Sequence, residues 1–147
     1  MTKKKSKKRS ASNNAAPPEP IALFVDRCAW SRPLGNALEA IGAKYIAHHQ
    51  RFAPAAPDEE WLEVAGREGW VVLTRDKHIR RRPPELEAFQ THKAIVFVLA
   101  AGNASAAETA ELVTRLYDKI QRLAAQAQPP VMYSVTRSGI SKPIKFK

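Results

Sequence analysis

Short apolar runs, separated by stretches with helical periodicity, constrain the fold of this chain more than any other feature. Three runs contain no polar residue, at residues 21–25, 70–73 and 94–99, and a fourth run, at residues 131–135, contains only Ser134. Such runs are too short for helices and are typical of strands that are covered on both faces. A shorter strand is predicted at residues 44–47. Because helical patterns separate the strands, the sequence predicts an α/β domain with a mainly parallel five-stranded sheet.

The helical patterns begin and end at residues that favour helix termini. The predicted helices start near Ser31, Asp58, Glu85 and Ser105. Asp58 is the expected N-cap of the second helix, and Gly42 and Gly69 are expected to end the first two. Ser105 is followed three residues later by Glu108, which completes a capping box. We therefore expect four helices, of which the last is a single long one.

Positive charge is concentrated at the two ends of the chain. The 147 residues carry a net charge of +10, and the middle is close to neutral. Residues 1–19 are lysine-rich and then rich in Asn, Ala and Pro, which predicts a disordered tail. Residues 136–147 are predicted to form a second basic tail, and residues 20–135 to form one domain. Basic tails favour nucleic acid, but they also suit solubility or an acidic protein partner.

Composition excludes several classes of protein. No apolar run approaches the ~18 residues that a membrane span needs. The basic N-terminus is not followed by the apolar region of a signal peptide, so we expect a cytoplasmic protein. The single cysteine, Cys28, excludes an internal disulfide and a cysteine-built zinc site. No glycine-rich phosphate loop is present, which argues against a nucleoside-triphosphate enzyme.

Acidic residues follow two of the predicted strands and open the helix between them. Asp26 comes directly after the first strand, Asp76 shortly after the third, and Asp58 and Glu59 begin the second helix. If the strand order is 2-1-3-4-5, Asp26 and Asp76 face each other across the crevice where such sheets bind ligands. Carboxylates that converge repel each other unless a cation lies between them. Mg²⁺ and Mn²⁺ prefer such oxygen ligands, so the sequence predicts a divalent-metal site.

Each of these acids also has a structural interpretation. Asp76 could bond its own backbone in a turn, as aspartates often do. Asp58 could be only a helix cap, and Glu59 could only favour the helix dipole. The three tryptophans, Trp30, Trp61 and Trp70, are interpreted as core or rim packing rather than as platforms for stacked bases.

Cations flank the predicted metal site and could hold the phosphates of a nucleic-acid strand. They are Arg27, Arg75, Lys77, Arg80, Arg81 and Arg82. The same charge could serve an acidic protein partner or a solvated helix entry, so phosphate binding is one of several interpretations.

Three segments of the chain resemble a known family. They are Phe-Val-Asp-Arg at 24–27, Pro-Asp-Glu-Glu-Trp-Leu at 57–62, and Val-Val-Leu-Thr-Arg-Asp-Lys-His-Ile at 71–79. Together they look like the PIN-like nucleases, especially the compact branch related to VapC-type toxins. The resemblance covers about residues 21–100 and implies a three-layer α/β/α sandwich. Larger PIN domains usually have a fourth acid, and Glu85 and Glu87, on a separate short helix, give no convincing match for it.

The resemblance also implies a function. It implies a metal-dependent endoribonuclease that uses Mg²⁺ or Mn²⁺, with Asp26, Asp58 or Glu59, and Asp76 as catalytic metal ligands. It further implies the toxin component of a toxin-antitoxin module, with RNA as substrate and a cognate antitoxin protein as partner. A homodimer is compatible with the sequence.

Two other functions compete with the nuclease. The first is a non-catalytic nucleic-acid-binding or protein-interaction module, in which the acids are only caps and turn residues. The second is a phosphoacceptor receiver domain, which would need paired acids after the first strand and a lysine after the fifth. Asp26 is single and Thr136 and Arg137 follow the fifth strand, so the receiver domain is disfavoured.

Overall fold

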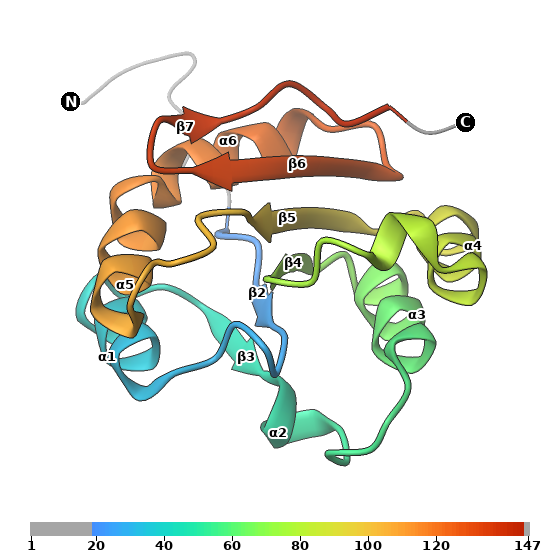
Figure 1. Cartoon of the computed structure of the whole chain (residues 1–147), viewed down its shortest axis with the longest axis horizontal. Coiled ribbons are helices and arrows are strands. Elements are labelled where there is room, and N and C mark those ends of the chain that lie inside the picture. Colours follow the sequence, from blue (N-terminus) through green and yellow to red (C-terminus); the bar gives the residue numbers. More distant parts are fainter. Residues whose placement is uncertain (1–18, 146–147) are drawn as a thin grey trace, which may run out of the picture.

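A six-stranded sheet between two layers of helices forms the centre of the computed structural model, which describes residues 19–145 (Figure 1). The strands are β2 (Leu23–Val25), β3 (Tyr45–Ala47), β4 (Val71–Thr74), β5 (Ile95–Leu99), β6 (Val131–Thr136) and β7 (Gly139–Ile140). Their order is β3-β2-β4-β5-β6-β7, and all neighbours are parallel except β6 and β7. The α/β class, the mainly parallel sheet and the 2-1-3-4-5 order of the first five strands are confirmed.

The sixth strand, β7, is not predicted by the sequence. Val135 pairs with Ile140 and Thr136 with Gly139, so the chain turns back and runs antiparallel to β6. A two-residue strand has no apolar run of its own, and the periodicity therefore does not reveal it. Residues 136–140, which the sequence assigned to the C-terminal tail, extend the sheet instead. Of the predicted N-terminal tail, only residue 19 lies within the described part of the chain.

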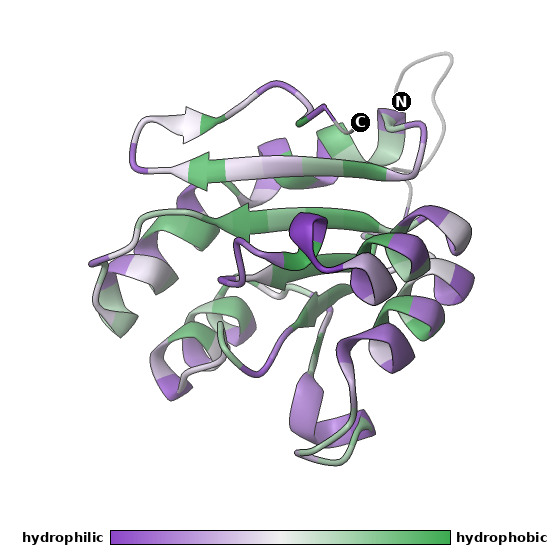
Figure 2. Cartoon of the chain, turned by 45° about the vertical axis from the view of Figure 1, so that its right-hand side comes forward, coloured by the Kyte–Doolittle hydropathy of each residue, from purple (hydrophilic) through white to green (hydrophobic). Residues whose placement is uncertain are grey.

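Helices cover both faces of the sheet. The first face carries α1 (Arg32–Ala40), α5 (Ala106–Arg115) and α6 (Tyr117–Gln126), and the second carries α3 (Asp58–Glu68), α4 (Pro83–Thr91) and the short η1 (Ile79–Arg81). Strand side chains alternate between the two cores, so that Leu23 and Val25 face the first and Phe24 the second. This double burial explains the continuous apolar runs, which form the central hydrophobic band in Figure 2.

Most of the predicted helix termini are present. The Leu34 N–H donates to Ser31 Oγ at 3.2 Å at the start of α1, and Gly69 ends α3 in the left-handed conformation with φ of 73°. Ser105 and Glu108 form the predicted capping box. The prediction of a single long fourth helix is wrong, because the helix is interrupted at Leu116, which separates α5 from α6. Both halves pack on one face of the sheet, so the apolar periodicity continues across the break.

Three helix starts differ from the prediction. Pro57, not Asp58, is the N-cap of α3, and no side chain caps this helix. The Asp58 carboxylate is therefore available for other contacts. A short helix, α2 (His48–Arg51), lies inside the predicted loop after β3. Helix α4 begins two residues earlier than predicted, at Pro83, because proline is suited to the first turn of a helix.

No helix within residues 19–145 combines the length and the apolar character that a bilayer crossing requires.

Candidate active site

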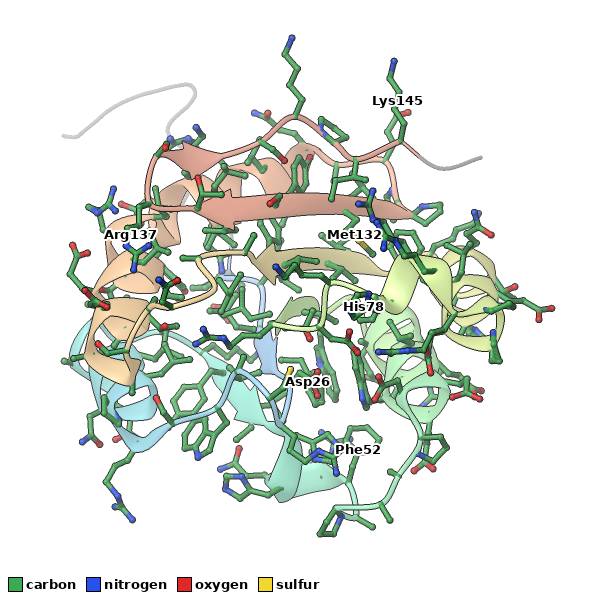
Figure 3. All side chains as sticks on the ribbon, in the orientation of Figure 1. Asp26, Phe52, His78, Met132, Arg137 and Lys145 are labelled. Carbon is green, nitrogen blue, oxygen red and sulfur yellow. The ribbon has the colours of Figure 1, made fainter. Side chains whose placement is uncertain are left out.

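A pocket of about 250 Å³ opens at the carboxyl ends of β2 and β4. It is lined by Asp26, Arg27, Cys28, Asp58, Arg75 and Asp76. β2 and β4 are parallel neighbours, with Val25 opposite Leu73, and this register brings the residues after both strands to one edge of the sheet. Figure 3 shows Asp26 between the two groups of helices, just beyond β2. Three acids that are far apart in the sequence therefore meet in one pocket.

Asp26 is the buried acid of this pocket, with 5% of its surface exposed. Its Oδ1 accepts a hydrogen bond from the Arg27 N–H at 2.7 Å. Its Oδ2 accepts from Thr74 Oγ1 at 2.8 Å and from Cys28 Sγ at 3.2 Å. Among residues 19–145 no cation lies within ion-pair distance of this carboxylate. The orientation of Asp26 is fixed by neutral donors, and its charge is not matched by a direct partner.

Thr74 connects the two strand-end acids. Its hydroxyl donates to Asp26 and accepts from the Asp76 N–H at 3.1 Å. In the sequence, Thr74 belongs to the segment at 71–79 that resembles the PIN-like nucleases, and its position as the last residue of β4 is the signal that could have identified it. Cys28 completes this group, because its sulfur lies 3.3 Å from Thr74 Oγ1. Burial of this sulfur, and then the nearby Asp26 carboxylate, raise the pKa of the Cys28 thiol, which favours the neutral donor.

Asp76 is paired with an arginine from the segment that follows it. Arg82 Nη1 lies 2.7 Å from Asp76 Oδ2 and Arg82 Nη2 lies 3.1 Å from Oδ1, a bidentate arrangement. The His78 N–H also donates to Asp76 Oδ1 at 2.9 Å, which is the turn contact anticipated for this aspartate. Burial alone would raise the pKa of Asp76, but the bonds from Arg82 and the His78 N–H outweigh it and hold the pKa below its ordinary value.

Asp58 reaches the pocket from the first turn of α3. Its Oδ1 accepts from Trp61 Nε1 at 3.1 Å, and its Oδ2 lies 4.0 Å from Arg82 Nη1. Burial raises the pKa of Asp58, and the charge of Asp26 raises it further. The structure thus brings Asp58 into the acidic pocket, whereas Glu59, the alternative at this helix start, does not line it.

A fourth carboxylate, Glu85, lies beside the site, although its place on a separate short helix argued against it in the sequence. Arg82 Nη1 donates to Glu85 Oε1 at 3.1 Å, and only 15% of the Glu85 side chain is exposed. Its charge contributes to the raised pKa of Asp58. Glu85 is on a separate helix, but η1 turns the chain so that the first turn of α4 faces the site. The spacing of Arg82 and Glu85, three residues apart, is the only sequence signal for this contact.

Two of the predicted phosphate-binding cations, Arg27 and Arg75, line the acidic pocket. The Arg27 guanidinium donates to the carbonyl oxygen of Pro54. Arg75 donates to Thr109 Oγ1 at 3.3 Å and to two carbonyl oxygens of the loop between β5 and α5, each at 3.4 Å. These contacts hold both arginines in the lining of the pocket.

The other predicted cations are not equivalent to one another. Lys77 and Arg80 line a different, smaller pocket of about 80 Å³ beside Val98 and Met132. Arg81 is exposed on η1. Arg82 is directed at the carboxylates and not outward, so its charge is used within the site.

A comparison of the sequence with known protein families matches residues 21–101 to the family described as PIN like domain. This match spans more than half of the chain and contains the three acids of the pocket. The chain belongs to the PIN-like domain family. No curated protein and no solved structure matches it. The sandwich of this PIN-like domain is a nuclease-like fold, and the family resemblance inferred from the three sequence segments is confirmed.

The donor set of this PIN-like domain has the chemistry of a site for a hard cation. All four acids supply carboxylate oxygens, which Mg²⁺ and Mn²⁺ prefer. Within the described range, residues 19–145, no group of three or more His, Cys, Asp or Glu side chains is arranged to hold a metal ion. The Arg82 guanidinium instead supplies positive charge to Asp76 and Glu85. The ligand types therefore fit such an ion, while three of the four carboxylates, those of Asp58, Asp76 and Glu85, lie within ion-pair distance of an arginine.

Asp58→Asn should stabilise the metal-free PIN-like domain at pH 7, raising the free energy of unfolding by about 0.5–1 kcal/mol. The amide can still accept from Trp61, and the repulsion by Asp26 disappears. Because the folded-state pKa of Asp58 is raised, the stability linked to its protonated form is lost as pH rises through that pKa. The gain in the variant should therefore shrink at acid pH. Urea denaturation in EDTA, at pH 7 and below pH 4, measures this difference.

Glu59→Gln is the matched control for this prediction. It removes a charge from the same helix turn, so it loses the same favourable interaction with the helix dipole without relieving the pocket. We expect a small loss of stability in this variant. An equal loss in Asp58→Asn would contradict the charge crowding inferred for the pocket.

Proposed function

We propose that this PIN-like domain is a metal-dependent endoribonuclease. The observation that carries the proposal is the convergence of Asp26, Asp58 and Asp76, from β2, α3 and the end of β4, on one pocket at the carboxyl edge of the sheet. Crowding of this kind costs folding free energy, as the raised pKa of Asp58 indicates. A binding role for the cluster explains why the charges are gathered there.

Asp26, Asp58, Asp76 and Glu85 are the residues that would hold Mg²⁺ or Mn²⁺. When bound, such an ion would neutralise charge on the phosphodiester and lower the pKa of a water molecule. Thr74 and Cys28 orient Asp26 before any ligand arrives. Arg27 and Arg75, in the lining of the same pocket, would contact the phosphates that flank the bond to be cut.

We further propose that the chain is the toxin component of a toxin-antitoxin module. The resemblance of residues 57–62 and 71–79 to VapC-type toxins supports this role, as does the small size of the domain. The cognate antitoxin would be a protein that covers the acidic pocket. An arginine from the antitoxin could contact the same carboxylates that Arg82 contacts in the free chain.

A second candidate function is a non-catalytic module that binds nucleic acid or protein. The pairing of Arg82 with Asp76 and Glu85 favours it, because this pairing satisfies two of the acids without a metal ion. In that case Arg82 is a permanent structural partner of the site, and lysines and arginines outside the acidic pocket bind RNA.

Incubation of the full chain with an end-labelled single-stranded RNA distinguishes the two functions. We expect cleavage in Mg²⁺ or Mn²⁺ and none in EDTA, and a single-stranded DNA of the same sequence should be cut far less. Gel analysis of the products also shows whether cleavage is internal. If the RNA binds but is not cut in either metal, the endonuclease proposal fails and the non-catalytic module is supported.

A further inference from the structure

A second pocket, of about 300 Å³, lies beside α1, at β3 and α2. This volume is at the lower end of the range of about 300–1,000 Å³ that is usual for small-ligand sites. The pocket is joined to the acidic site through the backbone, because the Trp30 N–H donates to the Asp26 carbonyl oxygen at 3.0 Å. α2 follows directly after β3, which is parallel to β2, so the residues of α2 lie at the same edge of the sheet as Asp26.

Three aromatic rings line this second pocket. The rings of Trp30 and Tyr45 are stacked with centroids 5.9 Å apart, and His49 meets Trp30 edge to face at 5.3 Å. The indole lies against α1 at Gly35, where a Cβ atom would collide with the ring. Gly35 is therefore the residue that lets the indole pack this closely. Trp30 is partly exposed, whereas Trp61 and Trp70 are buried in the second core as predicted.

Polar side chains surround these rings. Arg32, Asn36 and Glu39 lie on the exposed part of α1, and Gln50 comes from α2. The Glu39 carboxylate accepts a hydrogen bond from the Tyr45 hydroxyl at 2.6 Å. Gln50 Oε1 accepts from the Ala47 N–H at 2.8 Å, which leaves the amide nitrogen to donate to a ligand. Asn36 offers both a donor and an acceptor, and Arg32 offers a positive charge. Aromatic surfaces beside polar donors and acceptors are the combination that proteins use to bind unpaired bases of RNA.

We propose that this pocket, which we call the aromatic pocket, binds one nucleobase of a single-stranded RNA, next to the phosphodiester held at the acidic site. The aromatic rings would hold the base by stacking, and Asn36 and Gln50 would contact its edge. Arg32 would contact the adjoining phosphate. The choice of RNA as the ligand rests on the proposed function, but binding of the base does not require cleavage. Tight binding therefore requires a base at the one nucleotide that occupies the aromatic pocket.

Tryptophan fluorescence in EDTA tests the aromatic pocket without any cleavage step. The probes are a tetramer of adenylate and a ribose-phosphate tetramer that lacks the bases. We expect the adenylate tetramer to quench the partly exposed Trp30, and the abasic tetramer to have little effect. Trp30→Phe should retain binding but lose the quenching. In fluorescence anisotropy with a labelled adenylate tetramer, Trp30→Ala should bind about ten-fold more weakly.

Two further variants guard against a folding defect. His49→Ala removes an exposed ring from the same pocket and should also weaken binding of the adenylate tetramer. Ile41→Ala shortens an exposed side chain just beyond α1 and should bind normally. Circular dichroism checks that all variants are folded.

Several results would overturn the proposal that the aromatic pocket binds a base. Equal affinity for the abasic and adenylate tetramers would assign binding to phosphate contacts alone. Quenching that persists in Trp30→Phe would place the base elsewhere. Quenching that depends on protein concentration, without any oligonucleotide, would assign this face to a second copy of the chain. Base-dependent binding without cleavage in metal would support the pocket while the nuclease proposal fails, and the reverse pattern would reject only the pocket.

Discussion

Replacement of Asp26 by asparagine should lower the rate of metal-dependent RNA cleavage by about 10³-fold or more, which corresponds to about 4 kcal/mol of transition-state stabilisation. Asp26 is the most buried acid of the site and is oriented by three donors, from Arg27, Thr74 and Cys28. Asparagine has the same shape and keeps one acceptor oxygen, so the fold should be retained. The measurement is the initial rate of cleavage at saturating Mn²⁺, with circular dichroism as a check on folding.

Asp118→Asn is the matched control for Asp26→Asn. Asp118 is an exposed acid in the first turn of α6, on a helix that does not line the acidic pocket. Its replacement should leave the cleavage rate unchanged. If Asp26→Asn cleaves RNA as fast as this control, the acids of the pocket have a structural role and the proposed chemistry is wrong.

The positions of Asp26 and Asp76 illustrate what the sequence could predict about the site. Both follow apolar runs that can only be buried strands, and parallel strands place their carboxyl ends at one edge. No tertiary information beyond the strand order is needed for that inference. The strand order alone could not place Asp58 in the pocket, because the sequence also allowed this residue to be a helix cap. Pro57 takes the cap position in the structure, and the side chain of Asp58 is turned toward Trp61 and the pocket.

The contacts of Arg82 and Glu85 show where prediction from sequence ends. A run of arginines after Asp76 has the same pattern whether its members face RNA, solvent or a carboxylate. The path of η1 and the start of α4 at Pro83 decide that Arg82 is directed inward and that Glu85 meets it. The aromatic pocket is similar, because Trp30 comes from the loop before α1, Tyr45 from β3 and His49 from α2, and no local pattern encodes how these segments pack.

Arg82→Gln should destabilise the metal-free protein by about 1–2 kcal/mol. Arg82 is the one cation within ion-pair distance of Asp58, Asp76 and Glu85 among the described residues, and its loss leaves these carboxylates without a direct counter-charge. The effect is moderated by solvent, because 43% of the Arg82 side chain is exposed. Urea denaturation in EDTA measures the change. Arg81→Gln, which removes an exposed neighbour on η1, should change stability by less than about 0.5 kcal/mol.

The effect of Arg82→Gln should also depend on pH. Arg82 lowers the folded-state pKa of Asp76 below its ordinary value. The stability that this pairing contributes is therefore present above the unfolded-state pKa of about 3.9 and is lost as pH falls through the lower folded-state pKa. The difference between the wild type and Arg82→Gln should be largest near pH 7 and should diminish below about pH 4. A difference that is independent of pH would assign the role of Arg82 to packing of its aliphatic part.

The response of Arg82→Gln to Mn²⁺ provides a second measurement of the role of Arg82. If the carboxylates hold a divalent cation, Arg82 competes with that ion for Asp76 and Glu85. Mn²⁺ should then raise the melting temperature of Arg82→Gln more than that of the wild type or of Arg81→Gln. Because a ligand stabilises the folded state in proportion to the logarithm of its concentration above Kd, a titration with Mn²⁺ also ranks the affinities. Equal shifts in all three proteins would show that Arg82 does not occupy the position of the ion, and the acidic pocket would then have to accommodate the arginine and the metal together.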